Sequence, residues 1–109
     1  MKDQRLYCQD ILNRIAMLEE FTHSGKDAFM QSLMIQESVI RCFEVIGEII
    51  KRLDTTIIST YPKVDWKGLA GFRDILIHQY DKIDMVLVWE FFGEDIPPLK
   101  QAMNDFLNQ

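Results

Sequence analysis

The amino-acid sequence predicts an all-α protein, an up-and-down bundle of about five helices, and three observations support this prediction. The 109 residues include only three prolines and five glycines, so long intervals contain no helix breaker. In several of these intervals apolar side chains recur every three or four residues, the spacing of one helix face. The balance of 48% apolar and 27% charged residues is that of a globular chain. The length fits a single domain over residues 1–109.

Two helices are predicted in the N-terminal half of the chain. Residues 3–22 carry an apolar stripe, and the glycine of the following THSGKD segment suits a helix end. This stripe consists of Leu6, Ile11, Ile15, Leu18 and Phe21. A second, long helix is predicted from about Asp27 to Leu53, with an apolar seam of the kind that packs along another helix. The seam consists of Ile35, Val39, Cys42, Ile46, Ile49 and Leu53.

The opposite side of the second helix is charged, and its simplest interpretation is a solvated face. This face consists of Glu37, Arg41, Glu44, Glu48 and Arg52. Glu37 precedes Arg41 by four residues, an order that favours an ion pair on a helix. The same order relates Glu48 to Arg52. Gly47, in mid-helix, costs about 1 kcal/mol relative to alanine, so we expect another backbone to approach it closely.

The middle of the chain is predicted to contain a connection and a third helix. The segment DTTIISTYPKVD has several β-branched residues and Pro62, which indicates an extended connection. Asp65 can cap the helix that follows by accepting hydrogen bonds from its first turn. The seam of this helix, with steps of three and four residues, consists of Trp66, Leu69, Arg73, Leu76 and Tyr80.

Two short helices are predicted at the C-terminal end. The first runs from Asp81 to about Phe92 and is ended by Gly93. Asp95 then caps a second helix with two prolines, residues 97 and 98, in its first turn, where a missing N–H costs nothing.

Charge, hydropathy and cysteine content limit the class of function. The net charge is −5 and the pI about 4.9, which argues against binding nucleic acid through a broad basic surface. No apolar run approaches the roughly 20 residues that span a bilayer, so we expect no membrane association. The polar start MKDQRLYCQD has no signal-peptide core. Cys8 and Cys42 lack CxxC spacing, so we expect reduced, packed thiols in a cytoplasmic protein.

The stretch GFRDILIHQY, residues 71–80, places an arginine and a histidine on one predicted helix. Histidine exchanges protons near neutral pH, and a guanidinium suits a phosphate that gains negative charge. Arg73 and His78 are therefore candidates for phosphodiester cleavage. They are five residues apart, about 140° around a helix axis, so one straight helix does not direct both at one phosphate.

Three arrangements would bring the two groups together. The long Arg73 side chain reaches round, the helix bends near His78, or a second copy of the site faces the first in a dimer. In the structural alternative, His78 is a hydrogen-bonded residue at a helix end and Arg73 pairs with a carboxylate of the second helix. Asp81 and Asp84 lie near His78, but carboxylates that open a helix usually interact with its dipole. We therefore expect no metal, and no GxxxxGK[ST] or GxGxxG segment indicates a nucleotide cofactor.

Four segments of the chain, in order, resemble the HepT-like toxin family of the HEPN superfamily. GLAGFRDILIHQYDKIDMVLVWE resembles its motif of an arginine, four residues, a histidine, one residue and a tyrosine, with Arg73, His78 and Tyr80 in those places. VIRCFEVIGEIIKRL is similar to the family's second helix, whose Gly-Glu pair is here Gly47 and Glu48. YPKVDW and VWE…DIPPLK resemble the segments on either side of the motif and at the C-terminal end.

The resemblance implies a HEPN-like dimer in which two motif helices meet at one cleft. It implies a metal-independent ribonuclease toxin with Arg73 and His78 at the active site and RNA as substrate, with tRNA one candidate. It also implies an MNT-type nucleotidyltransferase antitoxin that silences the toxin by transferring AMP to Tyr80. The added bulk and negative charge would repel RNA phosphate.

Three further residues are expected to support this site: Asp74, Glu48 and Arg41. Asp74 stands where the family often has asparagine, and its carboxylate either adds negative charge near the phosphate or pairs with Arg73. Two other functions stay open beside the nuclease. One is a non-catalytic binding module for a nucleotidyltransferase partner or a nucleotide, which Asp74 and the acidic pI favour. The other is a helical dimer in which the motif serves packing.

Overall fold

The computed structural model describes residues 3–109, and they form helices joined by short turns. The elements, in chain order, are α1 Gln4–Thr22, α2 Lys26–Gln31, α3 Leu33–Ile50, α4 Thr55–Thr60, α5 Trp66–His78, the 3-10 turn η1 Tyr80–Lys82, and α6 Met85–Leu107. No strand occurs within these residues, so the predicted all-α class is confirmed.

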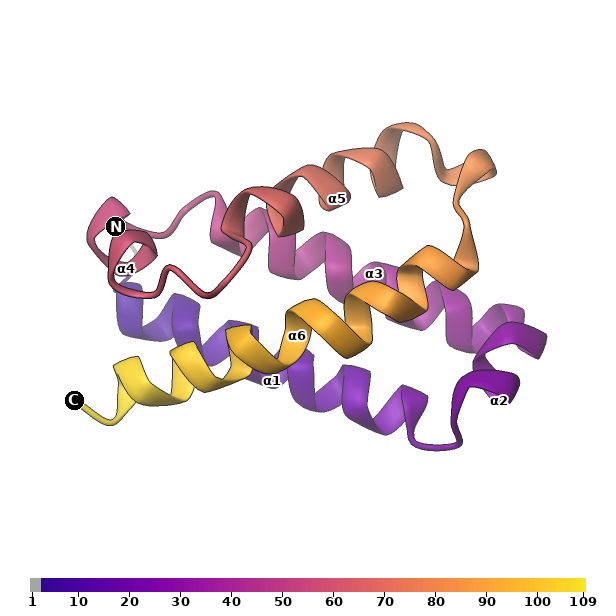
Figure 1. Ribbon diagram of the computed structural model, residues 1–109, viewed down its shortest axis with the longest axis horizontal. Helices are drawn as coiled ribbons and strands as arrows, with labels where there is room; N and C mark the ends of the chain where they lie inside the picture. The colour runs from indigo at the N-terminus through magenta and orange to yellow at the C-terminus, as the bar shows by residue number, and fades with distance from the viewer. Residues whose placement is uncertain (1–2) are drawn as a thin grey trace.

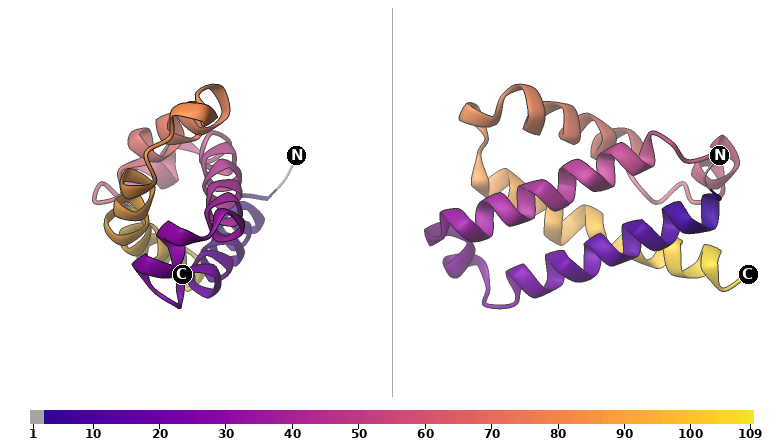
Figure 2. Two further views of the ribbon diagram at one scale, coloured as in Figure 1. Left: turned by 90° about the vertical axis from the view of Figure 1, so that its right-hand side faces the viewer. Right: turned by 180° about the vertical axis from the view of Figure 1, so that it is seen from behind.

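The four long helices α1, α3, α5 and α6 form an up-and-down bundle (Figure 1). The main helix pairs are α3 with α5, α1 with α3, and α1 with α6. Seen end-on, the long helices surround a common centre, whereas α2 and α4 lie at opposite ends of the bundle (Figure 2). Toward its C-terminal end, α5 diverges from the start of α6, and the chain crosses between them through η1 (Figure 1).

The core contains the apolar seams that the sequence predicts. Val39, Cys42 and Ile46 on α3 are at most 1% exposed, and Leu69 and Leu76 on α5 are equally well packed, at 2% or less. An aromatic cluster joins three helices: the rings of Phe72 and Phe91 stack at 4.1 Å, and Phe43 meets Phe72 edge-on at 5.4 Å. Ring contacts of this kind add to the burial free energy, so the cluster fixes the motif helix α5 against α3 and α6.

Two predictions about individual α1 and α3 side chains have opposite outcomes. Cys8 and Cys42 are buried free thiols, as expected. The prediction that Leu6 belongs to the buried stripe of α1 is wrong, because this residue is 55% exposed. The α1 stripe begins instead at Cys8, which lies three residues before Ile11 and so shares its face.

The predicted second helix is wrong in its bounds, because Ser32 divides it into α2 and α3. Ser32 has an extended backbone (φ −119°, ψ 110°), and its hydroxyl accepts a hydrogen bond from the Ile35 N–H at 3.2 Å. A serine side chain competes with the backbone for such donors and therefore favours a helix start. The turn lets α2 pack across the end of the bundle, where Phe29 is fully buried.

The predicted extended connection after α3 is also wrong, since residues 55–60 form α4. The hydroxyl groups of this helix bond to its own backbone: Ser59 Oγ donates to the Thr55 carbonyl at 2.9 Å and Thr60 Oγ1 to that of Thr56. Ile57 is buried against the bundle. Tertiary burial therefore overrides the β propensity of the segment.

The two predicted C-terminal helices form one helix, α6, with Gly93, Pro97 and Pro98 in its interior. Proline removes one backbone hydrogen bond and normally breaks a helix. Here Val88, Ile96, Leu99, Ala102 and Met103 form one buried stripe along the whole element. This continuous burial holds the helix together across the breaker residues.

Candidate functional site

The motif helix α5 lies against α3 at Gly47, where the sequence predicts the close approach of another backbone. A Cβ atom at Gly47 would overlap Arg73 Cβ, and it would lie 2.9 Å from Arg73 Cγ and 3.2 Å from the Leu69 carbonyl oxygen. Only glycine therefore lets α5 come this close. Asp65 caps α5 by accepting from the Gly68 N–H at 2.9 Å, which confirms the predicted start of the helix. These contacts fix where the Arg73 side chain begins.

The Arg73 guanidinium lies between two carboxylates. Its Nη2 is 3.0 Å from Glu48 Oε2 on α3, and its Nη1 is 3.0 Å from Asp74 Oδ1 on α5. The side chain is 23% exposed, and its buried Nε has no hydrogen-bond partner among the described residues. The pairing of Arg73 with a carboxylate of α3, which the structural alternative to a catalytic site predicts, is therefore present. The guanidinium is held at a fixed point of the surface and keeps one edge in contact with solvent.

Two more cations complete this cluster, which we call the α3–α5 charge network and which consists of Glu48, Lys51, Arg52, Arg73 and Asp74. Lys51 Nζ is 2.7 Å from Asp74 Oδ1, the oxygen that also accepts from Arg73. Arg52 Nη2 is 3.1 Å from Glu48 Oε1, so the expected pair of these residues is confirmed. Three cations face two carboxylates, which leaves one net positive charge in a chain of net charge −5.

The network shifts the protonation of its members. Hydrogen bonds from Lys51, and then from Arg73, lower the pKa of the Asp74 carboxyl group below its ordinary value. Hydrogen bonds to Glu48, and then to Tyr7, raise the pKa of Arg52. Opposite charges favour the ionised form of each partner. Asp74 is therefore a carboxylate at neutral pH, and it competes with any phosphate for Arg73.

The other predicted supporting residue, Arg41, lies apart from this network. Its Nη1 is 3.4 Å from Glu44 Oε1, on an exposed turn of α3 nearer the N-terminal end. Arg41 precedes Glu48 by seven residues, or about 10 Å along a helix axis. The structure therefore brings Glu48 and Asp74 to Arg73 and leaves Arg41 outside.

His78 is the last residue of α5, and it is exposed. Because α5 is a helix from Trp66 to His78, the angle of about 140° between Arg73 and His78 applies within one chain. Arg73 accordingly faces α3, whereas His78 projects at the open end of α5. The expectation that Tyr80 continues the helical seam is wrong, because its backbone belongs to η1. The Tyr80 side chain lies outside the described residues.

An apolar surface flanks the open end of α5. The exposed side chains are Ile75 at 46%, Ile77 at 39%, Val86 at 39% and Leu87 at 42%. Ile75 and Leu87 line a groove of about 460 Å³ between α5 and α6. We call these four residues the α5–α6 apolar surface.

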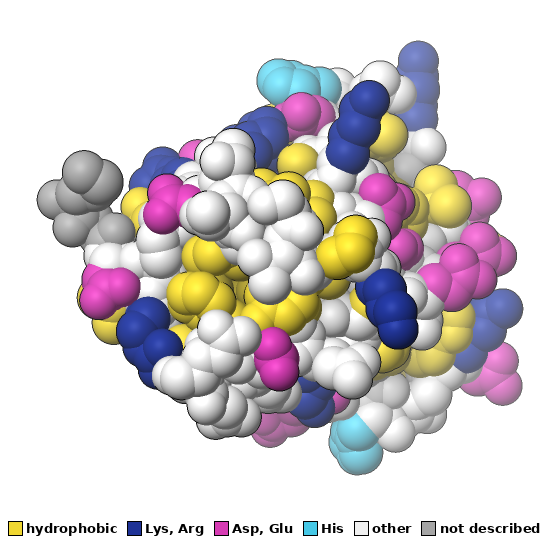
Figure 3. Space-filling view, turned by 60° about the vertical axis from the view of Figure 1, so that its left-hand side comes forward, with side chains coloured by type: hydrophobic (Ala, Val, Ile, Leu, Met, Phe, Trp, Pro, Cys, Tyr) yellow, Lys and Arg dark blue, Asp and Glu magenta, His cyan; other side chains and the backbone are white. Residues whose placement is uncertain are grey.

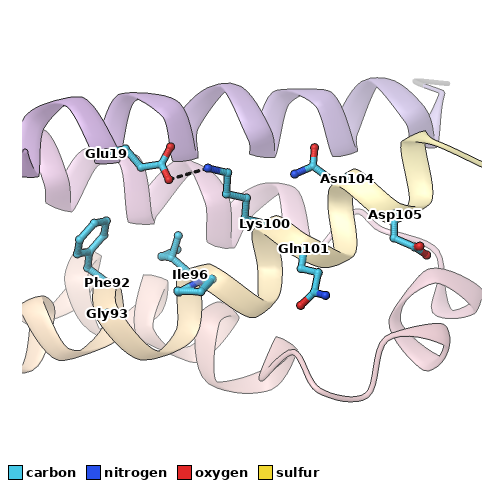
Figure 4. A pocket seen from close by; sticks show the side chains of 9 residues that line it. Glu19, Phe92, Gly93, Ile96, Lys100, Gln101, Asn104 and Asp105 are labelled. Carbon is cyan, nitrogen blue, oxygen red and sulfur yellow. Dashed lines mark hydrogen bonds and ion pairs between the residues drawn. The ribbon is translucent and has the colours of Figure 1, made fainter.

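Other pockets of the described residues lie away from the motif helix. A pocket of about 720 Å³ lies between α1 and α6 and is crossed by an ion pair of 2.8 Å between Glu19 and Lys100 (Figure 4). Phe92 and Ile96 form its apolar end, and neither Arg73 nor His78 lines it (Figure 4). On the face in Figure 3, basic side chains are scattered and acidic ones lie among them.

Among residues 3–109, no three His, Cys, Asp or Glu side chains are placed so that they could bind a metal ion together. Asp84 caps α6 by accepting from the Val86 N–H at 2.9 Å, which agrees with the helix-start interpretation of this carboxylate. In the same part of the chain, no helix combines the length and hydropathy that crossing a membrane requires.

The sequence interpretation missed Lys51. A usable signal was present, because Lys51 follows Gly47 by four residues and so lies on the same face of α3. The predicted close approach at Gly47 would have placed Lys51 beside the approaching segment, which the structure identifies as α5.

Comparison with known proteins agrees with this geometry. The family model "Ribonuclease HepT-like" matches residues 11–106. A Methanocaldococcus jannaschii protein named "Gamma-glutamylcyclotransferase and putative RNase" is 42% identical over 103 residues, 94% of this chain but only 46% of that protein. A second protein of that organism, named "Putative RNase", is 39% identical over 97 residues, 88% of this chain and 80% of the relative.

A "Probable ribonuclease HepT" of Thermococcus cleftensis is 37% identical over 95 residues, 86% of each chain. No solved structure shows a significant match. The family model covers most of the chain, including α3, α5 and the motif residues Arg73 and His78. The chain therefore belongs to the ribonuclease HepT-like family of the HEPN superfamily.

Proposed function

We propose that this protein is an endoribonuclease that cleaves RNA without a metal ion and works as a homodimer in the cytoplasm. The observation that carries the proposal is the fixed, partly exposed Arg73 guanidinium on the face where α3 meets α5. An immobilised guanidinium stabilises a crowded, negatively charged phosphorus centre without reorganising during the reaction. Family membership and the names of the relatives support RNA as the substrate.

In this mechanism His78 is the general base. It removes the proton of a ribose 2′-hydroxyl, and the 2′-oxygen attacks the adjacent phosphorus. The bond from phosphorus to the 5′-oxygen breaks, and that oxygen receives a proton from water or from a protonated His78. Arg73 neutralises the charge that collects on the phosphate oxygens in between.

The two groups act together only if two protomers share one site. Arg73 faces α3, whereas His78 projects at the far end of α5, so a single chain separates them. We propose that the α5–α6 apolar surface packs against its copy, which brings His78 of one protomer to Arg73 of the other. Exposed apolar side chains beside a functional residue are typical of an interface, and a two-fold axis would create two equivalent sites.

We further propose that the protein is the toxin of a toxin–antitoxin pair whose partner is an MNT-type nucleotidyltransferase. The partner would attach AMP to the Tyr80 hydroxyl by displacing pyrophosphate from ATP. Tyr80 is two residues from His78, on the turn between α5 and α6. An AMP group at this position adds negative charge close to the RNA phosphate and blocks access. Intact mass after co-expression with the partner tests this, because each AMP unit adds a fixed mass to the peptide with Tyr80.

A second candidate function is a non-catalytic module that binds a nucleotidyltransferase or a nucleotide. The observation that favours it is the engagement of Arg73 by both Glu48 and Asp74, which a phosphate must displace in part. Calorimetry separates the two functions. Tight binding of partner or nucleotide with no RNA turnover would favour the module.

The decisive experiment for the nuclease is RNA cleavage by purified protein in EDTA. We expect the wild type to cut, and Arg73→Ala and His78→Ala to lose activity while keeping their helical circular dichroism. His23→Ala is the matched histidine control, because His23 is exposed at the end of α1, where its Nδ1 contacts the Glu20 carbonyl at 3.2 Å. Cleavage that survives both motif substitutions would remove Arg73 and His78 from the mechanism.

A further inference from the structure

Lys51 occupies a position in the α3–α5 charge network that the cleavage mechanism does not use. Its Nζ is 2.7 Å from Asp74 Oδ1, and Arg73 Nη1 is 3.0 Å from the same oxygen. The ammonium and the guanidinium therefore lie on either side of one carboxylate oxygen. Two like charges are held this close only because Asp74 lies between them.

The ammonium of Lys51 keeps donors for a ligand. An ammonium group has three N–H donors, and the contact with Asp74 needs one of them. The Lys51 side chain is 38% exposed, more than the 23% of Arg73, so the remaining donors reach solvent. Both cations point to the surface at the junction of α3 and α5.

Charge balance also favours Lys51 as a phosphate-binding residue. Without it, Arg52 and Arg73 would face Glu48 and Asp74 with no net charge, and an approaching phosphate would gain little. Lys51 makes the network positive by one unit, the charge that one phosphodiester group neutralises. In a chain of net charge −5, such a local cation determines whether RNA binds at this point.

We propose that Lys51 is a second phosphate-binding residue of the RNA site, held beside Arg73 by Asp74. It contacts a phosphate of the RNA strand directly, either the scissile group or its neighbour. This inference rests on the proposed ribonuclease function and adds a substrate-binding residue to it. Arg73 and Lys51 then have different roles: the planar guanidinium stabilises the charge on the reacting phosphate, and the ammonium binds a phosphate of the RNA strand.

The test measures binding of a short single-stranded RNA in the non-cleaving His78→Ala background. Fluorescence anisotropy over a range of salt gives the affinity and its salt slope, which changes by about 0.7 for each phosphate contact on a single strand. We expect Lys51→Gln to weaken binding about tenfold and to reduce the slope by about 0.7. Lys51→Arg should retain most of the affinity and most of the salt slope.

Lys100→Gln is the matched control. Lys100 also forms a surface ion pair, at 2.8 Å from Glu19, with a similar exposure of 43%, but it lies between α1 and α6. The Lys100→Gln substitution removes the same charge as Lys51→Gln and breaks the same kind of ion pair, but at a site away from the charge network. We expect its salt slope to equal that of the background protein.

A merely structural role for Lys51, acting through Asp74, predicts a different pattern. If Lys51 only positions Asp74, Lys51→Gln has no effect once Asp74→Asn has removed the carboxylate. If Lys51 contacts phosphate, the loss of affinity and of slope persists in the Asp74→Asn background. Such a double-mutant comparison isolates the direct contact.

The outcomes separate this inference from the nuclease proposal. If the wild type cleaves RNA and Lys51→Gln binds like Lys100→Gln, the Lys51 proposal is overturned and the nuclease stands. If binding depends on Lys51 but the wild type never cleaves, the nuclease fails and the phosphate site stands. An effect of Lys51→Gln that disappears with Asp74→Asn also overturns the proposal.

Discussion

Replacing Gly47 with alanine tests the packing that positions Arg73. The new Cβ would overlap Arg73 Cβ and would lie 2.9 Å from Cγ and 3.2 Å from the Leu69 carbonyl oxygen. The position of a Cβ atom is fixed by its backbone, so α5 as a whole must move away. Overpacking of this kind costs up to about 3 kcal/mol, and alanine recovers about 1 kcal/mol of helix propensity.

The net expectation for Gly47→Ala is a loss of about 2 kcal/mol in the free energy of unfolding, or roughly 10 °C in the midpoint of thermal unfolding. Gly93→Ala is the matched control, because Gly93 is also inside a helix but a Cβ there meets no atom within 4 Å. It should stabilise by up to about 1 kcal/mol. Urea unfolding of both variants gives the comparison. If Gly47→Ala proves as stable as Gly93→Ala, the close approach of α3 and α5 is refuted.

Three further predictions follow from particular side chains. Asp74→Asn should lower stability more at pH 6 than at pH 3, because the pKa of the Asp74 carboxyl group is lowered below 3.8 in the folded protein and its stabilising contribution decreases as the pH falls through that folded pKa; urea unfolding at the two pH values measures this, and equal losses at both would contradict it. Ile75→Glu should convert a dimer to monomers in analytical ultracentrifugation, whereas Leu6→Glu on α1, 55% exposed, should not; a dimer that survives Ile75→Glu places the interface elsewhere. Burial raises the pKa of Cys8 to about 11, so iodoacetamide at pH 8 should alkylate it slowly in the native protein and rapidly in urea; fast native labelling would show that α1 opens.

Much of the fold was predictable because its helices obey local rules. The α1 stripe from Ile11 onward, the α3 seam and the Asp65 cap of α5 follow from spacing and side-chain type, and all three are present. The errors arose where tertiary burial overrides local preference. Pro97 and Pro98 predict a helix start, yet the buried stripe of α6 continues through them. Segment 55–60 predicts an extended chain, yet it forms α4 with Ile57 buried against the bundle.

The site was predictable in part for the same reason. Arg73 and Glu48 follow from the motif and from the Gly47 approach, because a glycine in mid-helix indicates a close neighbour. The sharing of Asp74 between Arg73 and Lys51 depends on how α3 and α5 are rotated about their axes, which spacing along one helix does not determine. The sequence did not predict the end of α5 at His78, because neither Gln79 nor Tyr80 is a helix-breaking residue.

The most direct test of the shared active site is mixing two inactive variants. Arg73→Ala and His78→Ala protein are unfolded together, refolded at equal concentration, and assayed for RNA cleavage in EDTA. If each site takes Arg73 from one protomer and His78 from the other, half of the random dimers carry one intact site. About a quarter of the wild-type activity should return under two-fold symmetry. A mixture that refolds into dimers yet remains as inactive as its components would contradict the account.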